Sequence, residues 1–389
     1  MIRFLDIQDK LLNLIGWAPE EFSGITIDSS LTKSETGLYF QQAHPLLTLT
    51  NLVNIAPDFK NIVTTSGVDP FSTWLKHKTV ASIQKAISRF CSEKLVAGTY
   101  KALCENKVLF DGTGRIVDTI VNKNNLVGFE IVPVRSKGVT TVINKIGLQF
   151  TMPGKYKLYL MHSSSIEPMR VIELEKKKKG FEWLEVDNLY LPYIGANDAG
   201  GSWYLCYKQS ELPEGSKAIK KVKDWSKGPC KSCSRVEYLA WQAWSRYIEI
   251  HPFYVNEELI DGTDLWDIDA NQYTYDTNYG INLEVSVMCD ITDLIIEQRN
   301  LFRDVIMKQV AVDFLREFAY NSNVRTNRHS INASRVEILY ELDGDSGSMK
   351  KSGLCYQLDL AYKALNISLD GIDRVCLPCN NNGIRFRSI

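Results

Sequence analysis

The spacing of apolar residues changes along the chain, and this change limits the possible folds more than any other feature. From about Leu126 to Tyr207, apolar and polar residues alternate with a period of two, which is the pattern of β-strands. Stretches such as 155–160 and 203–207 are rich in aromatic residues and are bounded by turn residues such as Pro153-Gly154. Several short strands at this spacing predict an antiparallel β-sandwich of the jelly-roll type.

On both sides of this region the apolar period is about 3.6, which is typical of helices. We expect a helical region over residues 61–125, in which Asp69-Pro70 begins a helix that continues as far as Leu103. Residues 226–389 are expected to form a mixed α/β region with a long helix near 290–320. The predicted fold class is therefore α+β, with the sandwich at 126–225 inserted between partly helical N- and C-terminal regions.

The helix near 290–320 is expected to be the longest in the chain and a central packing element. Asp290 is placed to cap it, and its apolar face is wide. The residues that we expect to be buried along this face are Leu294, Leu301, Phe302 and Val305.

Residues 1–60 are expected to form an arm followed by a cap. A short amphipathic helix is predicted near the start of the chain, and a polar, glycine-containing stretch follows it. Because that stretch is poorly suited to holding the helix against its own chain, we expect the apolar face to dock on a neighbouring subunit. The predicted interface residues are Leu11, Leu12, Ile15 and Trp17.

Charge and composition restrict the possible partners. The 389 residues include 45 Lys and Arg against 46 Asp and Glu, a formal net charge of -1. This balance gives no overall field that attracts nucleic acid, so we expect no specific nucleic-acid binding. No apolar run approaches the roughly 18 to 20 residues that cross a bilayer, and the N-terminus does not have the pattern of a signal peptide. We therefore expect a protein without a membrane segment, made in a reducing compartment.

Cysteine spacing provides the most specific local motif. Four of the nine cysteines form two CxxC pairs, Cys230/Cys233 and Cys376/Cys379, which suit a shared, tetrahedral structural zinc site. Roughly 140 residues separate the pairs, far more than in a local zinc ribbon, so disulfides formed after export from a reducing cytoplasm and unconnected thiols stay open as alternatives. Five single cysteines in apolar surroundings are expected to be reduced and buried: Cys91, Cys104, Cys206, Cys289 and Cys355.

A cluster of aromatic residues follows the first CxxC pair. Tyr238, Trp241, Trp244 and Tyr247 recur at three-residue spacing, which places them on one face of a helix. Such a face is either a seam of the core or a docking surface, since Trp and Tyr concentrate at interface hot spots. We regard Trp241 and Trp244 as candidate interface residues.

The sequence contains no catalytic constellation. His162 is followed by Ser163-Ser164-Ser165, but no nucleophile elbow and no positioned acid accompany it. Phosphate-binding and dinucleotide-binding fingerprints are also missing. We therefore expect a protein that is not an enzyme; a zinc hydrolase is the least favoured class, because a thiol-only ligand set indicates a closed structural site.

Several short segments are distinctive in combination: Gly37–Gln41, Gly147–Phe150, the Cys230/Cys233 pair, His251–Phe253, Asn278–Leu283 with Cys289-Asp290, and the Cys376/Cys379 pair. In these segments, which span most of its length, the chain resembles uncharacterised structural proteins of tailed phages and prophages of Bacteroidota. The resemblance implies a place in a virion, after synthesis in the cytoplasm of a bacterial host. It implies no catalytic residue.

We therefore expect a virion structural protein, a tail or baseplate component that forms a ring with copies of itself and contacts other tail or neck proteins. A neck or connector protein of the same virion is one alternative. The other is a carbohydrate- or peptide-binding module that uses Trp183 and Trp203 of the sandwich as stacking platforms.

Overall fold

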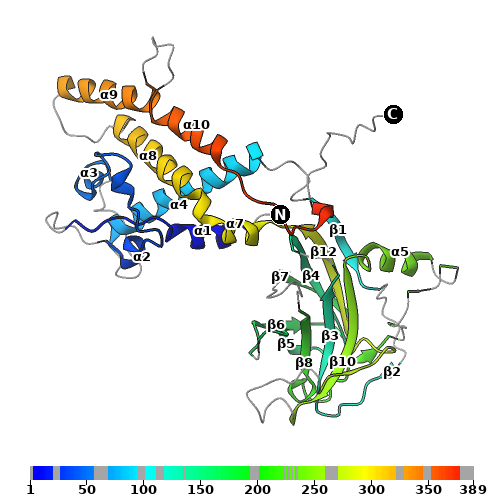
Figure 1. The fold of residues 1–389 in the computed structure, drawn as a ribbon. Coiled ribbons are helices and arrows are strands. Elements are labelled where there is room, and N and C mark those ends of the chain that lie inside the picture. Colours follow the sequence, from blue (N-terminus) through cyan, green and yellow to red (C-terminus); the bar gives the residue numbers. More distant parts are fainter. Residues whose placement is uncertain are drawn as a thin grey trace, which may run out of the picture. The chain divides into compact units, whose positions relative to one another are not determined.

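The structure is a computed structural model of the chain. It describes residues 3–20, 27–56, 69–94, 101–110, 118–134, 137–165, 167–192, 201–221, 225, 228–229, 231–232, 235–258, 270–320, 328–344 and 352–376. The chain forms two compact units, a β unit of residues 98–290 and 371–381 and a helical unit of residues 2–97 and 291–370 (Figure 1). Helices and antiparallel sheets are both present, so the predicted α+β class is confirmed.

The helical unit is assembled from segments that precede and follow the β unit in the chain. Its longest helices, α4 and α8, pack against each other, α1 packs on α4 and α7, and α9 and α10 pack on α8. Its elements are α1 Phe4–Leu12, α2 Ser29–Thr32, η1 Phe40–Gln42, α3 Leu49–Ile55, α4 Pro70–Lys94, α7 Thr292–Glu297, η5 Arg299–Phe302, α8 Arg303–Tyr320, α9 Arg328–Asp343 and α10 Leu354–Ala364. None of the helices in the described part of the chain is long and apolar enough to cross a membrane.

Helix α4 begins where the sequence predicts. Asp69 precedes Pro70, and its carboxylate accepts a hydrogen bond from the backbone N–H of Ser72 at 3.2 Å, as an N-cap residue does. The helix ends at Lys94, and residues near Leu103, expected to be helical, instead form strand β1 (Ala102–Val108). The apolar face of α4 includes Phe90, whose ring meets that of Phe302 edge to face at 5.0 Å.

The predicted long helix near 290–320 is broken into α7, a short 3₁₀ turn η5 and α8. Leu294, Phe302 and Val305 are buried as expected, but Leu301 is 48% exposed. The break explains this difference, because the 3₁₀ turn rotates Leu301 away from the face that a continuous helix would bury. Asp290 does not cap α7, whose N-cap residue is Ile291, and with 18 residues α8 is shorter than α4 with 25.

The β unit contains two antiparallel sheets. One has the strand order β1-β12-β4-β7 and the other β11-β10-β3-β8-β5-β6, with a separate pair β2-β9. Beyond β1, its elements are β2 Asp118–Thr119, β3 Asn125–Pro133, β4 Val139–Phe150, β5 Gly154–His162, β6 Arg170–Lys176, β7 Gly180–Leu191, β8 Trp203–Lys208, η3 Gln209–Glu211, β9 Ile219–Lys220, α5 Arg235–Trp244, β10 Ile248–Asn256, β11 Gln272–Tyr273, β12 Ile281–Cys289 and η6 Arg374–Cys376.

The inner faces of the two sheets form the core of a sandwich. The ring of Phe150 on β4 lies 4.5 Å from that of Tyr156 on β5 and 5.5 Å from that of Tyr207 on β8, so aromatic side chains of both sheets meet. Since successive side chains of a strand point to opposite faces, this contact fixes which residues face inward and which face outward.

The sandwich extends well beyond the predicted boundary at residue 225. Strands β10 and β12 both follow that boundary, and β12 lies between β1 and β4 in the centre of its sheet. The strands read from the sequence at 155–160 and 203–207 lie within β5 and β8.

Candidate functional site

The structure gives Cys376 a different partner from the one predicted. Cys376 forms a disulfide with Cys289, the last residue of β12, and both residues are buried. A sulfur in a disulfide is not a thiolate and does not bind zinc, so the predicted role of Cys376 as a metal ligand and the expectation of a reduced Cys289 are both wrong in this structure.

The rest of the predicted zinc set, Cys230, Cys233 and Cys379, lies outside the described residues. Within the described ranges, no group of three or more His, Cys, Asp or Glu side chains is placed to hold a metal ion. Zinc binding by these three cysteines therefore stays a prediction.

The remaining described cysteines are free thiols: Cys91, Cys104, Cys206 and Cys355. Burial raises the pKa of all four because it disfavours the charged thiolate, and it raises the pKa of Cys91 and of Cys104 to about 11. These thiols are therefore uncharged at neutral pH. Cys104 and Cys206 are buried as predicted, whereas Cys91 and Cys355 are only partly buried, so the prediction of burial is wrong for these two.

This raised pKa predicts slow alkylation of Cys91. At pH 8 only about one Cys91 in a thousand is a thiolate when its pKa is near 11. We expect its rate of reaction with iodoacetamide, followed by peptide mass spectrometry, to rise about tenfold for each unit of pH up to pH 10. A rate that levels off below pH 9 would show an ordinary thiol.

The N-terminal segment packs on its own helical unit. Leu11, Leu12, Ile15 and Trp17 are all buried there, so their predicted role as contacts to a neighbouring subunit is wrong. The Trp17 ring meets those of Phe40 and Phe314 at 4.9 and 5.4 Å. Its indole N–H donates a hydrogen bond of 3.2 Å to the Thr79 hydroxyl on α4.

Backbone hydrogen bonds explain why the polar stretch after α1 retains the segment. The N–H of Gly16 donates to Leu38 O at 3.2 Å, the N–H of Phe40 donates to Gly16 O at 3.0 Å, and the N–H of Trp17 donates to Leu31 O at 2.8 Å. Main-chain groups make these bonds whatever the side chains are, so the polar composition of this stretch does not prevent it from anchoring the helix.

Helix α5 carries the aromatic residues read as a seam or a docking face. Trp244 is buried and belongs to the core of the β unit, not to an exposed interface. Trp241 is partly buried and lies over Gly228, where an added Cβ would come within 2.6 Å of the ring. Tyr238 and Tyr247 are also only partly buried, so Trp244 fixes this face in the core while the other three aromatic residues keep an exposed part.

His162 is brought together with a serine, as the sequence allows. Its Nδ1 lies 2.7 Å from the Ser164 hydroxyl, and its ring packs 4.7 Å from the Trp203 ring. His162 is only 1% exposed, so the ring is part of the core and has little access for a substrate. This arrangement gives the pair a structural role.

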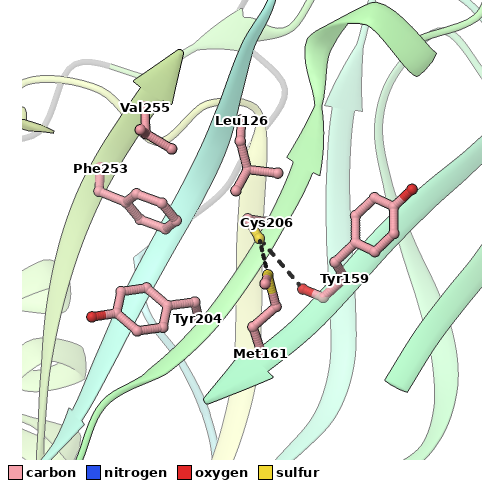
Figure 2. Close-up of a cluster of buried hydrophobic side chains, with 7 residues drawn as sticks. All are labelled: Leu126, Tyr159, Met161, Tyr204, Cys206, Phe253 and Val255. Carbon is pink, nitrogen blue, oxygen red and sulfur yellow. Dashed lines mark hydrogen bonds between the residues drawn. The ribbon is translucent and has the colours of Figure 1, made fainter. Parts of the chain in front are cut away.

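The outer face of the six-stranded sheet carries a second apolar core. Figure 2 shows its seven side chains, which come from β3, β5, β8 and β10 and are all buried: Leu126, Tyr159, Met161, Tyr204, Cys206, Phe253 and Val255. At its border the Tyr204 hydroxyl donates to the buried Glu130 carboxylate at 3.0 Å, and burial raises the pKa of Tyr204. These seven side chains are covered, so this part of the outer face offers no open binding surface, whereas Val171 and Tyr273 at its edges are exposed.

The two candidate stacking platforms have different environments. Trp203 is 2% exposed and its indole N–H donates to Pro192 O at 3.2 Å, so the prediction that it stacks on a ligand is wrong. Trp183 lies on β7, the edge strand of the four-stranded sheet, and is partly exposed. Its register partner on β4 is Gly147. The residues on either side of Gly147, Ile146 and Leu148, point into the core, so position 147 lies on the outer face of the sheet.

The outer face around Trp183 combines aromatic and charged side chains. The Phe181 and Trp183 rings meet edge to face at 5.1 Å, and an added Cβ on Gly147 would come within 2.7 Å of the first ring and 3.1 Å of the second. Beside them, Lys145 on β4 is paired across the sheet with Glu185 on one side and Glu284 on the other. We call Phe181, Trp183, Lys145, Glu185 and Glu284 the aromatic face.

The chain matches no protein-family model, and comparisons with curated proteins and with solved structures found no significant similarity. The fold and the surfaces of the chain therefore carry the functional inference.

Proposed function

We propose that this chain is a virion structural protein, a tail or baseplate component of a tailed bacteriophage that assembles into a ring with copies of itself. The order of its strands is the observation that carries the proposal. Eight strands remain when β10 and the two-residue strands β2, β9 and β11 are left aside. In chain order the first of these eight pairs with the last, the second with the seventh, the third with the sixth and the fourth with the fifth. The four pairs are β1 with β12, β3 with β8, β4 with β7 and β5 with β6.

This pairing is the one expected for a jelly roll. Two sheets, β1-β12-β4-β7 and β3-β8-β5-β6, then face each other, and β10 and β11 extend the second sheet beyond β3. Jelly rolls are common in viral structural proteins and in carbohydrate-binding proteins. Eight strands in two packed sheets form a rigid domain whose outer faces can bind other subunits or ligands. Since one fold serves several functions, a surface suited to contacts between copies is needed as a second support for the proposal.

The helical unit provides a surface suited to contacts between copies. On α9, Val336 and Tyr340 are four residues apart and therefore share one side of the helix, and they are 67% and 58% exposed. Tyrosine is enriched at protein interfaces and among the residues that contribute most to binding. We propose that this pair contacts the next subunit of the ring.

Mass photometry of the purified chain tests the proposal. We expect a discrete oligomer in equilibrium with single chains, and we expect Val336→Glu with Tyr340→Glu to shift it to single chains, because two buried carboxylates oppose association. Glu337→Gln, at an exposed position of the same helix, is the matched control and should leave the oligomer intact. Single chains at every accessible concentration of the unmodified protein would contradict ring assembly.

A further inference from the structure

We propose that the aromatic face of the four-stranded sheet binds a neutral saccharide, with the Trp183 ring as the stacking platform. This site is independent of the assembly contact on α9, so either proposal can fail without the other. The inference starts from Gly147, the residue at the centre of this part of the sheet.

Gly147 lets the two rings lie against the sheet. Any larger residue there would place a Cβ within 2.7 to 3.1 Å of the Phe181 and Trp183 rings, so these rings occupy the space that a side chain would fill. Both rings stay partly exposed. A broad ring that is held against a sheet and stays partly exposed suits the apolar C–H face of a pyranose ring.

Charged groups next to the rings suit the hydroxyl groups of a sugar. The Lys145 ammonium lies 3.3 Å from the Glu185 carboxylate, and Glu284 stands opposite Lys145 on the neighbouring strand. The three charged side chains therefore offer both hydrogen-bond donors and acceptors next to the rings. A mostly apolar site with a few polar groups that orient the ligand is typical of small-molecule binding sites.

The same charges argue against nucleic acid as the occupant. Within the aromatic face itself two carboxylates flank a single ammonium, whereas binding a phosphate backbone requires clustered lysine and arginine residues. The nearest cluster of lysines, Lys176–Lys179, belongs to the end of β6 and the turn before β7, where the backbone N–H groups of Lys177 and Lys178 donate to the Glu182 carboxylate. A neutral saccharide has no such requirement, because its hydroxyl groups accept and donate hydrogen bonds without carrying charge. The aromatic face therefore fits a neutral sugar better than an anionic polymer.

Fluorine NMR of the full chain labelled with 5-fluorotryptophan tests this assignment. The eight tryptophans give separate probes, and a Trp183→Phe variant identifies the Trp183 signal by its loss. We expect that signal to shift and saturate on titration with at least one of three probes: cellohexaose, chitohexaose and a linear mannohexaose. The buried Trp203 is the internal control, and its signal should stay in place.

Variants then separate binding from a purely structural role of the rings. We expect Trp183→Ala to weaken binding of the responding hexasaccharide about tenfold or more, and Glu185→Gln to weaken it several-fold with little change in thermal stability. Gly147→Ala keeps both rings but displaces them, so it should also weaken binding.

Two outcomes would overturn the proposal. If the Trp183 signal responds to none of the three hexasaccharides, the rings serve only to cover a strand glycine, a known stabilising arrangement in sheets. If the signal responds to protein concentration but not to sugar, the aromatic face is a contact between copies of the chain.

Discussion

Replacing both Cys289 and Cys376 by serine should lower the free energy of unfolding by about 4 to 5 kcal/mol. The two residues are 87 positions apart, and the loop that their disulfide closes contains α7, α8, α9 and α10. A cross-link over so long a loop removes many conformations from the unfolded chain, and this entropy is the main source of the expected effect. Urea unfolding followed by circular dichroism measures it.

A matched control separates the disulfide from the loss of a thiol. Cys355→Ser makes the same chemical change at a partly exposed free cysteine and should cost less than about 1 kcal/mol. Reducing the unmodified protein should reproduce most of the effect of the double substitution. Equal urea midpoints with and without reductant, together with free thiols at both positions in a peptide map, would show that the disulfide does not form.

Trp17→Ala should lower the free energy of unfolding by about 3 to 5 kcal/mol, the range for a large aromatic residue removed from a core. Trp17 is 1% exposed, contacts two other aromatic rings and gives its indole N–H to Thr79. Removing the Trp17 ring leaves a cavity between α4 and α8. It also leaves the Thr79 hydroxyl without the N–H group that donates a hydrogen bond to it. The same urea experiment measures the loss.

The control for this prediction lies in the same segment. Leu5 on α1 is 71% exposed, so Leu5→Ala should change stability by less than about 0.5 kcal/mol. A Trp17→Ala variant as stable as the unmodified protein, but unable to form the oligomer, would support docking of the N-terminal segment on a neighbouring subunit after all.

Local patterns in the sequence predict individual elements of this fold well. Asp69-Pro70 marks the start of α4, and alternation of apolar residues marks β5 and β8, because capping and side-chain direction depend on neighbouring residues. The same holds for the burial of Phe302, which lies on an apolar face of helical spacing.

Features that depend on distant partners are not predicted. β12 lies in the region predicted to be mixed α/β, but its place between β1 and β4 depends on residues more than a hundred positions away. The CxxC spacing drew attention to Cys376 and Cys379, yet Cys376 pairs with a single cysteine that has no motif. Trp183 and Trp203 both lie in strands, and only the fold shows which of them is covered.

The wrong prediction for the N-terminal segment has a related cause. The stretch after α1 has few apolar side chains, so its composition predicts weak attachment to the rest of the chain. The stretch is held instead by hydrogen bonds of the backbone groups of Gly16, Trp17 and Phe40. Main-chain hydrogen bonds leave almost no trace in amino-acid type, so side-chain composition underestimates how firmly such a stretch is held.

Quantitative mass spectrometry of purified phage particles tests the proposed place in a virion most directly. Particles from the strain that encodes this chain should contain it at a fixed number of copies per particle, as expected for a closed ring. Abundant chain in the cell lysate, with none in the purified particles, would contradict a structural role in the virion.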